Sequence, residues 1–222
     1  MKFINNHWYD LCGLLAIPVA IFAILNYENM PTLQLLALLN FIVILLHQFE
    51  EYRFPGGGQA LPNTIRGKDA IHDRYPLNQQ NAMAGNLFVS LISYTLPIFF
   101  PNQIWLALMP IILGCFFQVI MHIIIGGFKY KLYYNPGVIA VVFGHVPIGI
   151  YFFWYTISNN LIGFWDIVLG LVYMAFSGLL YTKLFYGKMA DKNTLYPFTQ
   201  DEMNRFDMYK KITTSKAYLD EK

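Results

Sequence analysis

The stretch "TLQLLALLNFIVILLHQFEEYRFPGGG", residues 32–58, contains no lysine, arginine, aspartate or glutamate before Glu50. A transmembrane helix needs about 20 largely apolar residues, with roughly 17 to 25 tolerated. The apolar part therefore predicts a membrane-spanning helix over Thr32–Gln48. A histidine, two glutamates and an arginine stand at its end, where an apolar helix has no structural need of them.

The composition of the whole chain supports this interpretation. Of 222 residues, 56% are hydrophobic and only 13% are charged, whereas a soluble domain carries about 25% charged residues. Long stretches hold no charge, so we predict an all-α integral membrane bundle of six transmembrane helices. The predicted spans are Leu11–Tyr27, Thr32–Gln48, Ala82–Phe100, Ile104–Gly126, Gly137–Ile157 and Leu161–Tyr186.

The 15 lysines and arginines all fall on one side of this topology. The loops at 28–31, 101–103 and 158–160 carry none of them. Because positive charge gathers on the cytoplasmic side of a membrane, we predict a multi-pass protein of the cell membrane with both termini in the cytoplasm. The net charge of +2 follows from this distribution and gives no reason to expect nucleic acid as a partner.

The chain divides into one membrane domain and one polar tail. We place the six-helix domain at residues 1–187, with a long cytoplasmic loop at 49–81 whose Gly, Pro and Asn content predicts irregular structure. The cytoplasmic tail covers residues 188–222. The pattern "TQDE" at Thr199–Glu202 is typical of a capping box, and apolar residues recur every three positions after it. These features predict a short amphipathic helix in the tail.

Several polar side chains are predicted at the same depth, in the cytoplasmic half of the membrane. His47, Glu50 and Glu51 are three and four residues apart, so they share one helical face. The third, fourth and fifth predicted spans supply Asn86, His122 and His145. Asn135 lies just before the cytoplasmic end of the fifth span. Ionisable groups at membrane depth are costly and usually mark a functional site. Each also has a plainer explanation, as a solvated interfacial charge or as an interhelical hydrogen bond.

The two carboxylates raise an electrostatic question. A helix carries partial negative charge at its C-terminal end, where Glu50 and Glu51 lie, so they need a compensating positive charge. Arg53, Lys68 or a metal ion can supply it.

The residue types favour a metal. Catalytic zinc commonly takes three His or Glu ligands and keeps one position open for water. We predict a divalent ion, zinc by preference, on His47, Glu51 and His122, with His145 as a further candidate ligand. Glu50 is the predicted general base, although the two glutamates can exchange roles. The amides of Asn86 and Asn135, which we count among the catalytic residues, are suited to orienting a substrate or stabilising an oxyanion.

The function predicted from this set is a metal-dependent membrane hydrolase acting on a lipid or hydrophobic small molecule from the cytoplasmic side. Two alternatives stay open. One is a metal-free hydrolase with a glutamate base, since "EEYR" at Glu50–Arg53 vaguely resembles the motif of CAAX-protease-like membrane proteins. The other is a proton- or cation-coupled transporter or binding protein, although no inverted repeat of the usual kind is visible.

The segment "HQFEEYRFPGG" at His47–Gly57 resembles the signature of the HXXEE family of bacterial multi-pass membrane proteins. His122, "YNPG" at Tyr134–Gly137 and Asn86 resemble that family's later pattern, so that the likeness covers about residues 40–155. The resemblance implies a membrane protein and leaves its activity open. His145 is not matched to this pattern.

Overall fold

The computed structural model describes residues 2–65 and 70–220, of which the Lys2 side chain is left out. Within this part of the chain the secondary structure is helical, and no strand is formed. Six helices are long and apolar enough to cross a membrane, which confirms the predicted helix bundle. We number them spans 1 to 6: Phe3–Asn29, Thr32–Tyr52, Gln79–Phe99, Ile104–Lys129, Val138–Ser158 and Phe164–Lys188.

Several spans consist of consecutive helical segments. Span 1 contains α1 (Lys2–Asn26), span 2 is α2 (Thr32–Tyr52), and span 3 joins α4 (Gln79–Phe88) to α5 (Leu96–Phe99). Span 4 joins α6 (Ile104–Ile112) to wider π-helical turns over Leu113–Phe117 and Ile120–Lys129. Span 5 contains α7 (Val138–Ala140), π-helical turns at Val141–His145 and α8 (Val146–Ser158), and span 6 begins with α9 (Phe164–Tyr181).

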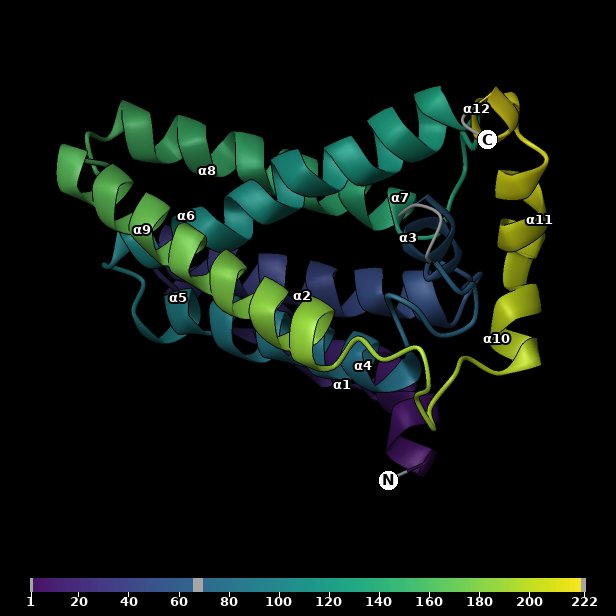
Figure 1. Ribbon diagram of the computed structural model, residues 1–222. Helices are drawn as coiled ribbons and strands as arrows, with labels where there is room; N and C mark the ends of the chain where they lie inside the picture. Colours follow the sequence, from purple (N-terminus) through teal and green to yellow (C-terminus); the bar gives the residue numbers. More distant parts are fainter. Residues whose placement is uncertain (1, 66–69, 221–222) are drawn as a thin grey trace.

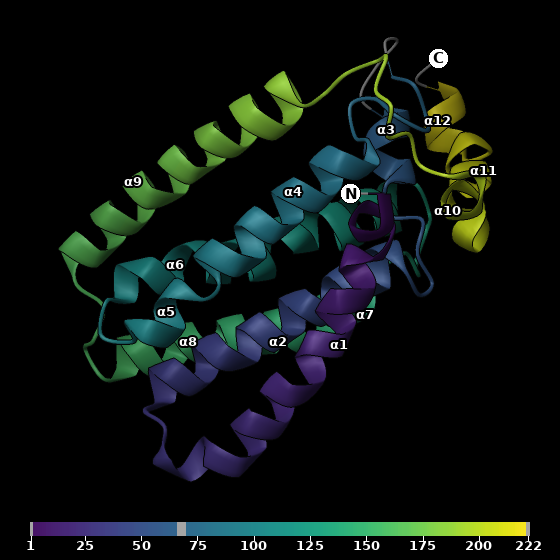
Figure 2. The same ribbon diagram turned by 90° about the horizontal axis from the view of Figure 1, so that it is seen from below.

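Span 2 lies at the centre of the bundle. It contacts α1, α5, α7 and α8, whereas α9 packs chiefly on α6 at the outside (Figure 2). In its most apolar 18 residues span 2 is 50% buried, against 11% for span 6. About half of span 2 thus faces other parts of the protein, while much of span 6 is left to contact lipid.

The helical part of span 2 is longer than predicted. It continues to Tyr52 instead of ending at Gln48, which places Glu50 and Glu51 inside its last turn. Span 1 is also longer and includes Asp10. A charge is tolerated there because Asp10 pairs with His7 at 2.8 Å and with Arg53 at 3.1 Å.

Both termini lie at the same end of the bundle, together with the long connection and the tail (Figure 1). We call this the polar end and define it as residues 53–65, 70–78 and 189–220. Its connection is not wholly irregular as predicted, because Ala60–Ile65 forms helix α3. The buried Asn63 organises this segment by donating to the carbonyl of Leu77 at 2.8 Å and accepting from its N–H at 2.8 Å. Lys68 lies outside the described residues.

The tail crosses the polar end as three short helices: α10 (Gln200–Asn204), α11 (Met208–Thr213) and α12 (Lys216–Asp220) (Figure 1). The capping box of α10 is formed as its sequence indicates. Left-handed backbone at Phe206 and Asp207 then separates α10 from α11. Met208 and Ile212 are fully buried in a cluster with Leu61 and Tyr130, so the tail is packed against protein.

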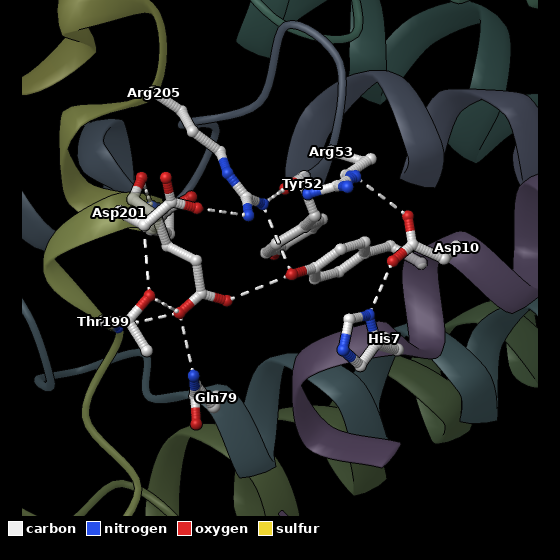
Figure 3. A network of polar contacts seen from close by, with 11 residues as sticks. His7, Asp10, Tyr52, Arg53, Gln79, Thr199, Asp201 and Arg205 are labelled. Carbon is white, nitrogen blue, oxygen red and sulfur yellow. Dashed lines mark hydrogen bonds and ion pairs between the residues drawn. The ribbon is translucent and has the colours of Figure 1, made fainter. Parts of the chain in front are cut away.

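Polar contacts fix the tail to the ends of the spans (Figure 3). The buried Glu202 accepts hydrogen bonds from Gln79 at 2.8 Å and from Tyr9 at 3.4 Å. Arg205 donates to the main-chain carbonyl of Tyr52, the last residue of α2, and to the Tyr9 hydroxyl at 3.3 Å. The tail thus bonds directly to the turn that carries the two glutamates.

Candidate metal centre

Three of the predicted site residues converge between the spans, in the part of the bundle next to the polar end. His47 and Glu51 are one turn apart on α2, and His122 comes from the π-helical part of span 4. The Glu51 Oε1 atom lies 3.4 Å from His122 Nε2 and 3.7 Å from His47 Nε2. One ligand atom from each residue lies within 4.8 Å of the others. Ligands of a tetrahedral zinc site are about 3.3 Å apart, so this group is slightly wider than a closed site.

Gly137 permits the two imidazoles to approach. Their ring centroids are 5.0 Å apart and the rings are perpendicular. A Cβ atom on Gly137 would lie 2.5 Å from His122 Cε1 and 2.8 Å from His47 Cε1. The backbone φ of Gly137 is +100°, a region that residues with a side chain rarely adopt. Both constraints require glycine here, in the "YNPG" segment before span 5.

Asn135 orients the imidazole of His122. Its amide nitrogen donates to the carbonyls of His122 at 2.8 Å and Leu132 at 2.9 Å, which fixes the amide orientation. Its oxygen then lies 2.7 Å from His122 Nδ1 and must accept a hydrogen bond from the N–H at that position. A neutral His122 therefore presents the lone pair of Nε2 toward Glu51. This bond gives Asn135 a role in positioning His122, and the substrate-orienting role predicted for it stays a prediction.

When His122 is neutral, the centre brings together groups that repel one another unless a cation joins them. A carboxylate oxygen and the lone pair of His122 Nε2 face each other at 3.4 Å. His47 is 1% exposed, and neither of its ring nitrogens has a hydrogen-bond partner among the described residues. Buried polar atoms without partners are rare and need an explanation. Two imidazoles and a carboxylate are zinc ligands by type, so the residues present fit a divalent metal.

Glu50 lies apart from this group. Its two oxygens accept the main-chain N–H groups of Ile139 at 3.1 Å and Ala140 at 3.0 Å. These N–H groups belong to the first turn of span 5, where the helix has no internal acceptor and carries partial positive charge. The charge of Glu50 at the unfavourable end of α2 is thus compensated by the favourable end of another helix. A carboxylate held in this way is poorly placed to act as the predicted general base.

Arg53, one of three candidates to compensate the glutamates, is engaged elsewhere. Its guanidinium pairs with Asp10 on α1 at 3.1 Å (Figure 3). Nearby, outside the spans, burial and then the charge of Glu50 raise the pKa of Tyr134.

The other two predicted residues lie beside the centre. The ring of His145 is 5.7 Å from that of His47 by centroid, but His145 bonds Asn40 and is not one of the three grouped ligands. Asn86 donates to the Tyr52 hydroxyl at 3.4 Å and to the carbonyl of Ala82 at 2.9 Å.

Sequence reasoning missed Asn40, which is buried on span 2. Its position seven residues before His47, two helical turns away on the same face, is the signal that would have found it.

A cavity of about 220 Å³ adjoins the centre. Its polar lining includes Glu51, His122, Asn86 and Asn135, while Phe117 and Tyr181 bring aromatic rings from spans 4 and 6. Met208 of the tail lines it as well. Glu51, with 20% of its side chain exposed, is the only member of the three-residue group that is not nearly fully buried. The centre can therefore be reached through this cavity.

Together, the fold and the buried cluster define a multi-pass membrane protein with a His/Glu centre formed between spans. The family described as "Protein of unknown function with HXXEE motif" matches residues 38–152, just over half of the chain. The chain belongs to this family. Comparisons with curated proteins and with solved structures gave no match.

Proposed function

We propose that this protein is a membrane-embedded, metal-dependent hydrolase that acts on a lipid or another hydrophobic molecule at the cytoplasmic side of the cell membrane. The observation that carries the proposal is the convergence of ligand atoms from His47, Glu51 and His122, in which Glu51 Oε1 lies 3.4 Å from His122 Nε2 and 3.7 Å from His47 Nε2. A protonated His122 paired with Glu51 would explain one of these contacts. It would leave both nitrogens of the buried His47 without partners among the described residues.

His47, Glu51 and His122 would hold the ion, with zinc the first choice for two imidazoles and a carboxylate. When bound, such an ion lowers the pKa of a coordinated water and polarises a carbonyl or phosphoryl group. Asn135 keeps the Nε2 lone pair of His122 directed at the centre. Glu50 holds the first turn of span 5, and with it Gly137, against the two rings.

The cavity supports an amphiphilic substrate. A volume of about 220 Å³ is below the roughly 300–1,000 Å³ of sites that enclose a drug-sized ligand. It accommodates a head group, and the apolar remainder of the molecule would lie along Phe117 and Tyr181 of spans 4 and 6. Asn86, which also lines the cavity, is positioned to hydrogen-bond that head group.

Metal analysis of the protein purified in detergent tests the first step. We expect about one zinc equivalent in the wild type, because the residues form a single site. His47→Ala, Glu51→Ala and His122→Ala should each lose it, while Gln34→Ala, at a partly buried hydrogen bond near the other end of span 2, should keep it. A metal-free wild type would contradict the proposal.

Activity separates the alternatives. Hydrolysis of ester- or amide-linked lipid substrates should require the metal and stop on chelation. Hydrolysis that persists in a metal-free preparation would favour the His122–Glu51 pair acting as acid and base. Movement of a substrate or of protons across liposomes without a covalent product would favour a transporter.

A further inference from the structure

His145 is a buried histidine of which one ring nitrogen is hydrogen-bonded and the other has no partner in the described part of the chain. It lies in span 5 and is 1% exposed. Its Nδ1 atom is 2.8 Å from the side-chain oxygen of Asn40, itself 2% exposed on span 2. Its Nε2 atom has no hydrogen-bond partner among the residues that the structure describes. Because buried polar atoms are nearly always bonded, this nitrogen needs an explanation.

His47, beside it, also has ring nitrogens without a hydrogen-bond partner among the described residues. Its ring is next to that of His145, with centroids 5.7 Å apart and planes inclined by 67°. Neither His47 nitrogen has a partner in the described part of the chain. Its Nε2 atom belongs to the three-residue group with Glu51, so its Nδ1 atom remains to be accounted for.

The positions of the ring protons make His47 Nδ1 a donor and His145 Nε2 an acceptor. A neutral imidazole carries one N–H donor and one acceptor nitrogen. His145 donates from Nδ1 to the oxygen of Asn40, which leaves Nε2 as an acceptor. His47 can bind a metal through Nε2 only if its proton is on Nδ1, which makes Nδ1 a donor. The donor of His47 and the acceptor of His145 therefore fit each other without charge on either ring.

The other histidine of the centre is supported in the same way. His122 Nδ1 donates to the oxygen of Asn135 at 2.7 Å. Metal-binding histidines almost always donate their second N–H to such a partner, which fixes the tautomer and the ring orientation. Of the two, only His47 has no ring hydrogen bond of normal distance and angle in the described contacts, although the main chain of Gly137 is close to its ring. His145 is the polar ring beside it.

We propose that His145 is a positioning residue for His47, and this inference rests on the proposed metal site. One buried water molecule accepts a hydrogen bond from His47 Nδ1 and donates one to His145 Nε2. Such waters bridge otherwise unbonded buried polar groups. Asn40 holds His145 in the tautomer that this bond requires. The role assigned to His145 thus changes from ligand to support of a ligand.

Zinc affinity, measured by competition with a chromophoric chelator in detergent, tests this role. His145→Phe keeps a ring of similar shape and removes the acceptor, so we expect one bound zinc with 10- to 100-fold weaker affinity. Asn40→Leu should weaken binding in the same direction. Thr156→Val is the matched control. Thr156 is buried on span 5, as His145 is, but its hydroxyl donates only to carbonyls of its own helix, so zinc affinity should not change.

Imidazole nitrogen NMR of the zinc-loaded wild type provides a second readout that does not depend on a variant folding. We expect the proton on Nδ1 in both His47 and His145. A proton on His145 Nε2, or an unchanged affinity in His145→Phe, would overturn the inference while leaving the metal site standing. A wild type that binds no zinc would instead remove the metal site itself, and the inference with it.

Discussion

Gly137 is the residue that lets the two imidazoles approach, and its replacement is the sharpest test of the centre. Gly137→Ala places a methyl group where the His47 and His122 rings lie and imposes a strained φ of +100°. Left-handed backbone alone costs a residue with a side chain about 1–2 kcal/mol. We expect zinc affinity to fall at least tenfold, measured by chelator competition. Gly178→Ala, where a Cβ atom meets nothing within 4 Å, should have no effect on zinc affinity. Equal behaviour of the two variants would contradict the geometry described here.

The adjacent Glu50 and Glu51 have different surroundings, so replacing one should change metal binding and replacing the other should change stability. Glu51→Ala should abolish zinc binding, because it removes one of three ligands. Glu50→Ala should retain the metal and lower the free energy of unfolding by about 1–3 kcal/mol, because two N–H groups of span 5 lose their acceptor. Metal content and thermal unfolding in detergent measure the two effects. Loss of metal in Glu50→Ala with an unchanged melting temperature would reverse these assignments.

The spacing in "HQFEE" was sufficient to predict that His47 and Glu51 share a face, since this follows from helical periodicity. The same periodicity could not distinguish the two glutamates, because both lie near that face. What distinguishes Glu50 is the first turn of span 5, about 90 positions away in the sequence. The role of Asn135 was similarly hidden, since its bond to His122 depends on how the 130–137 turn folds back.

At the scale of elements, the six spans followed from composition because charge is excluded from membrane helices. The sequence did not predict the π-helical turns that carry His122 and end at His145. Such turns change the face that a residue presents and are frequent at functional sites. Nor did it predict that α3 and the tail pack together, because Gly- and Pro-rich segments indicate a turn without indicating what the turn contacts.

The docking of the tail depends on Arg205, which bonds to the end of α2 and to Tyr9 (Figure 3). Arg205→Ala leaves these buried acceptors without their donor, so we expect the segment around α10 and α11 to detach more often. Limited proteolysis should then cleave the tail several-fold faster, with the spans intact. Arg74→Ala is the control, since Arg74 pairs only with its neighbour Asp73 at the surface. Equal cleavage rates in the two variants would show that apolar packing of Met208 and Ile212 is sufficient.

For the whole molecule, orientation in the membrane decides which compartment would supply the substrate of the proposed hydrolase. The structure places the tail and the loop between spans 5 and 6 at opposite ends of the bundle (Figure 1). The distribution of lysine and arginine predicts that the tail end is cytoplasmic. Single cysteines at Leu195, 86% exposed in the tail, and at the exposed Asn159 test this prediction once Cys12 and Cys115 are changed to alanine. A membrane-impermeant maleimide should label Asn159→Cys in intact cells and Leu195→Cys only after permeabilisation. The reverse pattern would move the His/Glu centre to the outer leaflet and with it the source of any lipid substrate.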